Sequence, residues 1–552
     1  MSERPSLVIP LAGGCLAALL LLFWLVRRDR LSAPPPPAAA ASAPGAPAPP
    51  AATPTAAGAA TPASLANGPV PAVVRALRDL PRAAGARAHE ALLTFTSAEA
   101  YQRFLARAAR LGLTILGKLD ALLSVRVRYD SLAALQDDLL NNPADYADAG
   151  ANFLVSIPAV PPKEDRAAQA LVPLGNNTLA FLGANGDRSQ WGRGVTIAVL
   201  DSGVAPDATF GSGRVQSLDI GLGTAPGSGT DDGHGTAVAA LAAGQAPDAP
   251  GVAPAANLLS IRITDASGQS DIFTVAQAIV AAVDAGAPII NISFGGYVTS
   301  GVLTQAIDYA TQHGTVIVAS AGNDQAAQLT WPAADPRVVS VGAVDALEQQ
   351  VYFSNAGAQL KLTAPGYGVQ TAWLDGQRIY FDGTSASAPI AAGAIAALMS
   401  TTPGLSATQA AQVLEQYASD GGAPGPDPDY GAGIVNLGWA MNRNNALYVD
   451  TAIAGHYYDP ATGQMEFVVQ NRSGQGVSGL VLSVDASGAT TTYSLPLLGP
   501  GASTVVATPV DQAKLKAGQT LVFQTQLANP PGLVDQVPAN NRKLSALAPP
   551  GQ

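Results

Sequence analysis

The stretch Val195-Thr-Ile-Ala-Val-Leu-Asp-Ser-Gly203 is an apolar, β-branched run that stops on an aspartate. A short run of this kind is typical of a parallel strand buried on both faces. The glycine that follows breaks the strand, so Asp201 lies at its carboxyl end. A second such run, Thr315-Val-Ile-Val-Ala-Ser-Ala-Gly322, leads into Asn323. The sequence therefore predicts an α/β domain with a mostly parallel sheet and polar side chains at its carboxyl edge.

Two further segments place a reactive side chain at the start of a helix rich in small residues. His234 stands in Asp232-Gly-His-Gly-Thr-Ala-Val-Ala239, and Ser385 stands in Gly383-Thr-Ser-Ala-Ser-Ala-Pro389. The alanines and glycines that follow predict helices packed closely at the centre of the domain. Pro389 is expected in the first helical turn, where backbone N–H groups have no intrahelical partner. The free N–H groups of that turn favour negative charge beside Ser385.

These residue types point to nucleophilic catalysis by a serine. A serine hydroxyl needs a base within hydrogen-bond reach, and an imidazole base needs a buried carboxylate to hold its tautomer. The order Asp201, His234, Ser385 is one of the known chain orders for such a triad. Asn323 taken alone is more simply a turn residue after a strand. Together with the Ser385 N–H, its side-chain amide supplies two donors for an oxyanion.

The motifs resemble those of the subtilisin-like serine peptidases (subtilases, peptidase family S8) from about Trp191 to Leu437. The resemblance also rests on Gly251-Val-Ala-Pro254, Pro288-Ile-Ile-Asn-Ile-Ser-Phe-Gly295, Trp331-Pro-Ala333, Phe353-Ser-Asn355, Ala364-Pro-Gly366 and Tyr430-Gly-Ala-Gly-Ile-Val-Asn436. It implies a serine endopeptidase that acts on proteins or peptides through an acyl-enzyme. In that case Asp201, His234 and Ser385 are the triad, and Asn323 is the side chain of the oxyanion hole.

The same resemblance implies where a substrate lies. Ser293, Phe294 and Gly295 form the edge that pairs with the substrate backbone, a form of β-augmentation. Ala321 and Gly322 belong to the segment 319–322 that walls the pocket for the side chain preceding the scissile bond. The small residues of the segment 323–331 favour an apolar or aromatic side chain in that pocket.

The expected architecture is a subtilisin-like three-layer αβα domain with a second domain on each side. Residues 175–445 form the catalytic domain. Residues 73–160 follow a β-α-β-β-α-β order, which is ferredoxin-like and resembles the prodomain that assists folding of subtilisins and inhibits them. Its expected strands are 90–96, 113–118, 122–129 and 152–157, and its helices are 98–111 and 131–140. An ordinary α+β domain with another role is the alternative.

The tail of this predicted prodomain, after Pro158, would occupy the active site, with self-cleavage between residues 158 and 180. From about residue 448 the sequence pattern changes to alternating apolar and polar residues, typical of strands, separated by Gly, Asn and Ser turns. The expected strands are 465–470, 479–484, 492–495, 503–506 and 521–526. They predict an immunoglobulin-like β-sandwich over 448–545, serving adhesion or stability.

The N-terminal part differs in composition from the rest of the chain. Residues 7–26 carry no charge and are numerous enough to cross a bilayer as a helix, so residues 1–30 are interpreted as an uncleaved membrane anchor. Residues 31–72 are almost entirely Ala, Pro, Ser, Thr and Gly, which predicts an extended linker. The arginines after the apolar run favour a cytoplasmic body, whereas the domain layout favours the cell envelope. The expectation adopted is a single-pass protein with an extracytoplasmic catalytic part.

Charge and cysteine content limit the binding partners and disulfides that the chain can have. The chain carries a net charge of −11, and residues 161–445 hold 10 Lys and Arg against 23 Asp and Glu, which makes nucleic acid an improbable partner. Cys15, the single cysteine, precludes an intrachain disulfide. No cofactor is expected. Whether the protein binds calcium stays an open question. No site is assigned, because Asp231–Asp232 and Asp427–Asp429 fit a turn and a solvated loop better than a metal site.

Two other functions use the same sequence features. A peptide ligase shares the triad and differs only in letting an amine outcompete water. A surface adhesion protein uses the peptidase fold as a scaffold, which an intact triad disfavours. The mass of the products separates the first from a peptidase, and labelling by a fluorophosphonate separates the second.

Overall fold

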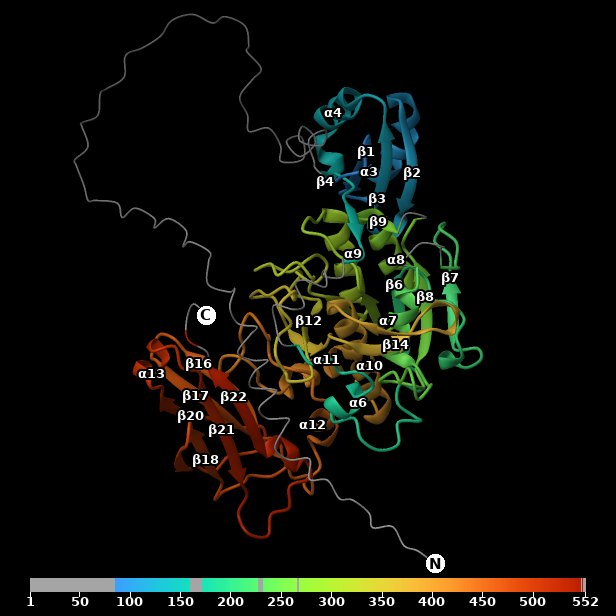
Figure 1. Cartoon of the computed structure of the whole chain (residues 1–552). Coiled ribbons are helices and arrows are strands. Elements are labelled where there is room, and N and C mark those ends of the chain that lie inside the picture. The colour runs from blue at the N-terminus through green and yellow to red at the C-terminus, as the bar shows by residue number, and fades with distance from the viewer. Residues whose placement is uncertain (1–84, 159–170, 227–231, 266–267, 548, 550–552) are drawn as a thin grey trace, which may run out of the picture.

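A computed structural model describes residues 85–158, 171–226, 232–265, 268–547 and 549. Three units follow one another along the chain (Figure 1). A small α+β domain packs against helices of a large central α/β domain, and an all-β domain with a short helix lies at the other end. The expected anchor at 1–30 and linker at 31–72 lie outside the described residues.

The N-terminal domain is a four-stranded antiparallel sheet with two helices. Its strand order is β2-β3-β1-β4, the order of a ferredoxin-like fold. Its elements are β1 (Glu90–Phe95), α3 (Ala98–Arg107), β2 (Leu113–Leu119), β3 (Ser124–Tyr129), α4 (Leu132–Asn141) and β4 (Tyr146–Gly150). Aromatic side chains of β1, α3 and β4, Phe95, Phe104 and Tyr146, meet in its core.

The expected fourth strand of this domain, at 152–157, is wrong. Strand β4 ends at Gly150, and the residues after it leave the domain. Part of the expected segment forms β5 (Leu154–Ser156), which pairs antiparallel with β9 (Gln269–Asp271) of the central domain. The apolar run at 153–157 therefore pairs with the central domain through β9, and not with the N-terminal sheet.

The central domain is built on a seven-stranded sheet in which every pairing is parallel. The strand order is β13-β12-β11-β10-β6-β8-β7. Its strands are β6 (Thr196–Asp201), β7 (Val215–Leu218), β8 (Asn257–Arg262), β10 (Ile289–Ile292), β11 (Val316–Ser320), β12 (Val339–Val344) and β13 (Leu362–Pro365). A hairpin of β14 (Val369–Ala372) and β15 (Arg378–Phe381) lies outside the sheet.

Side chains of the inner strand β6 alternate between two hydrophobic cores. Ile197 and Val199 face the core formed with α7 and α10, whereas Ala198 and Leu200 face the core formed with α8 and α9. The helices are α6 (Thr178–Phe181), α7 (His234–Ala243), α8 (Ile272–Asp284), α9 (Gly301–Gln312), α10 (Thr384–Thr401), α11 (Ala407–Gln416) and α12 (Leu437–Asn442). This arrangement confirms the predicted three-layer α/β fold.

The C-terminal domain is a two-sheet sandwich, as expected. Its sheets have the orders β16-β17-β20 and β19-β18-β21-β22, and Phe467 and Phe523 pack between them. Its elements are β16 (Thr451–Asp459), β17 (Gln464–Asn471), β18 (Val481–Ala486), β19 (Ala489–Ser494), β20 (Ser503–Pro509), α13 (Gln512–Lys516), β21 (Leu521–Ala528) and β22 (Arg542–Leu547). Strands β16 and β22 were not predicted, and β16 contains a bulge near Gly455 that interrupts its alternation.

Among the described residues, no helix is both long and apolar enough to span a bilayer.

Candidate active site

Asp201 and His234 form a buried acid–imidazole pair. Asp201 is the last residue of β6 and is fully buried, and His234 is the first residue of α7 and is 4% exposed. The imidazole Nδ1 lies 2.8 and 3.0 Å from the two carboxylate oxygens of Asp201. One of those oxygens also accepts the Ser202 N–H at 2.7 Å. The carboxylate therefore holds Nδ1 and directs the opposite ring nitrogen away from itself.

The imidazole is held in place by its neighbours as well. The Phe381 and Phe294 rings meet it edge to face, with centroids 5.2 and 6.2 Å from that of His234. The start of α7 is tied to the end of β6, because the Ser202 hydroxyl accepts the Gly235 N–H and donates to the Asp232 carbonyl. Ser202 was not predicted to matter, although it stands directly after the aspartate.

Ser385 lies in the first turn of α10 and is 2% exposed. Within the described residues its hydroxyl donates to the Ser293 carbonyl at 3.4 Å and not to the imidazole. Ser293 and Phe294 bridge the two groups, since Ser293 bonds Ser385 while the next ring packs on His234. Because a hydroxyl can donate in several directions, a χ1 rotation changes which acceptor it faces.

Pro389 does not lie in the first turn of α10, contrary to expectation. The helix starts at Thr384, so proline is its sixth residue and cannot donate to the Ser385 carbonyl four residues earlier. That carbonyl instead accepts a hydrogen bond from the Ser293 hydroxyl at 3.2 Å. Asn291 in turn donates to the Ser293 hydroxyl at 3.1 Å. A side chain from the end of β10 thus supplies the donor that Pro389 lacks.

Asn323 presents its amide nitrogen beside the Ser385 backbone. Its side-chain oxygen accepts both the backbone N–H and the hydroxyl of Thr384, each at 2.9 Å. A backbone N–H can only donate, so the oxygen must face Thr384 and Nδ2 must face the other way. A Cβ on Gly383, whose φ is +122°, would lie 2.9 Å from Nδ2 and 3.6 Å from the Ser385 nitrogen. The two donors therefore border one small space that glycine keeps open.

The predicted substrate edge pairs with β5, the strand that follows the N-terminal domain. The Gly295 N–H donates to the Ser156 carbonyl at 3.3 Å, and the two residues form an antiparallel bridge. The side chain of Ser293 is fully buried and that of Phe294 is 1% exposed, so only backbone of this edge is available to a partner strand. Val155 helps to line an apolar hollow beside the edge, together with Ile272, Val275, Ile292, Phe294, Gly295, Leu303, Trp331 and Pro332.

Ala321 and Gly322 lie across from this edge, after β11. The Gly322 N–H donates to the Thr384 hydroxyl at 3.2 Å, so Thr384 connects this segment to Asn323 and to the turn of Ser385. Thr384 was not singled out from the sequence, although its place directly before the nucleophile was the available signal. The predicted triad, amide and edge residues thus all come from the region around the carboxyl ends of β6, β10 and β11 and the starts of α7 and α10.

Polar groups outside this region make ordinary hydrogen bonds in the described part of the chain. No cluster of three or more His, Cys, Asp or Glu side chains that could hold a metal ion occurs there. Asp427 accepts the N–H groups of Ala423, Asp429 and Tyr430, which accounts for its loop. His456 bonds the hydroxyls of Ser545 and Thr525, and burial lowers its pKa to about 3.

Comparison with known proteins agrees with this geometry. The Subtilase family profile matches residues 192–433. Subtilisin Savinase from Lederbergia lenta is 34% identical over 258 residues, which cover 45% of this chain and 91% of that protein. An alkaline protease from Shouchella clausii is also 34% identical over 258 residues, and the match covers 65% of its length.

One solved structure covers more of the chain. Fervidolysin from Fervidobacterium pennivorans, described as a keratinolytic enzyme related to subtilisin, has a TM-score of 0.55 at 20% identity and covers 85% of this chain and 77% of its own. At that identity the likeness concerns the fold alone. The match over nine-tenths of Savinase, together with the acid–imidazole pair and the serine turn, shows that this chain belongs to the subtilase family and is a serine-type endopeptidase.

Proposed function

We propose that Ser385 attacks the scissile carbonyl while His234 takes its proton and later passes it to the leaving amine. Asp201 orients the imidazole and stabilises its charged form. The developing oxyanion binds the Ser385 N–H and the Asn323 Nδ2, which are donors that the fold holds in place before substrate arrives. The observation that carries this assignment is the buried Asp201–His234 contact of 2.8 Å beside the turn of Ser385. Water then hydrolyses the acyl-enzyme.

We also propose that the chain is made as a zymogen whose N-terminal domain blocks the groove. Strand β5 lies between β9 and Gly295, which is where a substrate backbone is expected to pair. Residues 157 and 158 follow directly, and the next residues, 159–170, lie outside the described ranges. A strand that enters the groove in this way excludes substrate and brings its own downstream bonds toward Ser385. Self-cleavage between residues 158 and 180 is the outcome that we infer.

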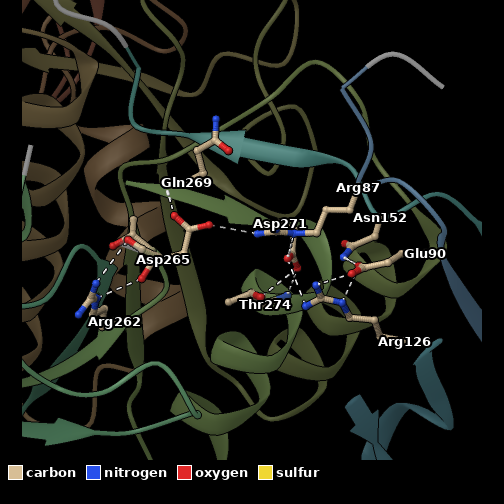
Figure 2. Close-up of polar contacts among 10 residues, drawn as sticks. Arg87, Glu90, Arg126, Asn152, Arg262, Asp265, Gln269, Asp271 and Thr274 are labelled. Carbon is tan, nitrogen blue, oxygen red and sulfur yellow. Dashed lines mark hydrogen bonds and ion pairs between the residues drawn. The ribbon is translucent and has the colours of Figure 1, made fainter. Parts of the chain in front are cut away.

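The N-terminal domain is further held by a buried ionic network that Figure 2 shows. Asp271 is 1% exposed and caps α8, since one carboxylate oxygen accepts the Thr274 N–H and hydroxyl. Its other oxygen contacts Arg87 at 2.5 Å and Arg126 at 3.3 Å, two arginines of the N-terminal domain. Burial alone would lower the pKa of Arg87, but Asp271 raises it overall. One carboxylate therefore both caps the start of α8 and binds the N-terminal domain.

Two further hydrogen bonds cross this interface. Asn152 donates its amide N–H to Glu90, which also pairs with Arg126, and its side-chain oxygen accepts the Phe273 N–H at the start of α8. Asp148 accepts the Gly301 N–H at the start of α9. Negative and acceptor groups are thus presented to two helix N-termini, where they are favourable. This polar complement supports the proposal that the domain is an intramolecular inhibitor.

Finally, we propose that residues 7–26 anchor the enzyme in a membrane with its body on the extracytoplasmic side. The support is the uncharged run itself and the Ala/Pro-rich spacer that follows it. A reporter that is active only outside the cytoplasm, fused after Arg30, is expected to be active. An inactive fusion that accumulates normally would place the body in the cytoplasm.

Replacing the nucleophile tests catalysis and self-cleavage together. Ser385→Ala is expected to remain a single unprocessed chain and to lose about a millionfold in turnover, the loss seen when subtilisin loses its nucleophile. Denaturing gels, peptide hydrolysis and fluorophosphonate labelling check this, and product masses show whether water or an amine accepts the acyl group. Normal processing of the variant would contradict self-cleavage. Retained turnover would contradict the assignment of Ser385 as the nucleophile.

Ser293→Ala tests whether the Ser293 hydroxyl positions the nucleophile. The variant leaves the Ser385 carbonyl without its donor, a loss of about 1–3 kcal/mol, while the backbone that pairs with substrate is unchanged. We expect kcat to fall about tenfold or more with KM nearly constant. Ser387→Ala is the matched control, because Ser387 is equally buried on α10 but bonds Ala364 and Pro365. Equal effects of the two variants on kcat would contradict the positioning role.

Asp271→Asn tests the ionic hold on the N-terminal domain. Asparagine still caps α8, but it removes the charge that faces Arg87 and Arg126, which is worth about 2 kcal/mol or more for a buried pair. The processed N-terminal fragment is therefore expected to bind the catalytic part about thirtyfold more weakly in gel filtration and inhibition assays.

Asp207→Asn is the control for this variant. Asp207 also caps a helical turn and pairs with an arginine, Arg378, but both belong to the central domain. Its substitution should leave binding of the N-terminal fragment unchanged. Unaltered binding in Asp271→Asn would contradict the ionic hold through Arg87 and Arg126.

A further inference from the structure

Strand β5 enters the groove in one register. It pairs with β9 on one side, and Ser156 forms an antiparallel bridge with Gly295 on the other. The Gly295 N–H donates to the Ser156 carbonyl at 3.3 Å. Hydrogen-bonded pairs alternate along an antiparallel ladder, so the next such pair falls two residues further on in each segment. In this register the residue that faces Ser293 is Pro158.

Contacts upstream fix this register. The Val155 side chain is 6% exposed and lies in the apolar hollow beside the edge, and a slip by one residue would turn it to the opposite face of the strand. The Phe153 carbonyl accepts the Ile272 N–H at 3.0 Å. The side-chain oxygen of Asn152 accepts the Phe273 N–H at 3.2 Å. The strand therefore cannot slide along the groove without breaking its contacts with the start of α8.

The residue paired with Ser293 is the one whose carbonyl comes within reach of the nucleophile. The Ser293 carbonyl accepts the Ser385 hydroxyl at 3.4 Å. A backbone N–H bonded to the same carbonyl would lie next to that hydroxyl, because both contact one oxygen. The carbonyl carbon of that residue follows its nitrogen by two covalent bonds. The peptide bond that the register of β5 aligns with Ser385 is therefore the one between residues 158 and 159.

Proline lacks the backbone group that this position uses. Pro158 has no N–H to donate to the Ser293 carbonyl, and its ring carbon Cδ takes the place of that hydrogen. A carbon keeps a longer distance from a carbonyl oxygen than an N–H nitrogen does, so the ring holds the following carbonyl away from Ser385. The Ser293 carbonyl accepts the Ser385 hydroxyl instead, and this hydroxyl is then not directed at His234.

We propose that Pro158 makes the peptide bond between residues 158 and 159 resistant to the active site that β5 occupies. The N-terminal domain then holds in the groove a segment that binds in the register of a substrate and is not cut there. This inference rests on the proposed function of Ser385 and narrows the proposed processing window, because the first cut must fall beyond residue 159. Such a cut requires the chain to leave the register of β5, or a second enzyme molecule to supply the active site.

Exchanging the proline in the full chain tests the proposal. Wild-type protein is expected to give no fragment that begins at Ala159. Pro158→Ala restores the N–H, so it is expected to give that fragment and to be processed about tenfold or more faster. Intact masses and N-terminal sequencing over time measure both. Pro161→Ala is the matched control, because it removes a proline of the same segment without restoring an N–H opposite Ser293, and it should not produce the Ala159 end.

Short peptides separate the missing N–H from the shape of the ring. Three peptides with the sequence of residues 153–162 carry Pro, Ala or N-methylalanine at position 158 and are incubated with the processed enzyme. The kcat/KM for cleavage after position 158 should be about tenfold or more higher for Ala than for Pro. N-methylalanine, which has the alanine side chain but no N–H, should be as slow as Pro. These peptides decide the matter even if Pro158→Ala does not fold.

Three results overturn the proposal. They are an Ala159 end in the wild type that Ser385→Ala lacks, unchanged processing of a folded Pro158→Ala, and equal cleavage of the Ala and N-methylalanine peptides after position 158. Failure of the proposed function is distinct from these. The double variant Pro158→Ala/Ser385→Ala should remain intact, and if it were cut at Ala159, another protease would make that cut and self-cleavage by Ser385 would be contradicted.

Discussion

The structure depends on the cost of burying the Asp201 carboxylate and on what compensates it. The side chain is fully covered, and an unpaired charge in such a place is strongly unfavourable. It is paired with the imidazole of His234 and accepts the N–H of Ser202, whose hydroxyl in turn fastens the first turn of α7. Since that turn carries His234, the same contacts that stabilise the buried charge also set the position of the base.

The same backbone edge is expected to pair with a substrate and pairs with β5 of this chain. The backbone of Gly295 and of β9 pairs with β5, the strand that follows the N-terminal domain. Strand pairing alone is unselective, because any extended peptide can supply the same hydrogen bonds. The arginine pair on Asp271 and the acceptors at the starts of α8 and α9 add contacts that an ordinary peptide substrate lacks. None of these contacts involves Ser385, so they can hold the domain without depending on the sequence at the cleaved bond.

The sequence predicted what is local and missed what depends on a distant partner. Asp201, His234, Ser385 and Asn323 were predicted as site residues because they stand at the end of a strand, shortly after one or in the first turn of a helix. Such positions can be read from a few neighbouring residues. The fourth strand of the N-terminal domain was misplaced because Tyr146–Gly150 is weakly patterned beside the more apolar segment at 153–157. Only the presence of β9, far along the chain, decides that β5 leaves its own sheet.

Pro389 shows the same limit at the scale of a single hydrogen bond. A proline near the start of a helix suggests a first turn, where no N–H is missed. The structure instead begins the helix at Thr384, which leaves the Ser385 carbonyl without a helical donor, and the Ser293 hydroxyl takes that role. The hydrogen bond from Ser293 that replaces the helical one connects the turn of the nucleophile to the edge expected to receive substrate. Ser293 thus touches Ser385 twice, by its hydroxyl and by its carbonyl, so a displacement of the edge is transmitted directly to the turn that carries the nucleophile.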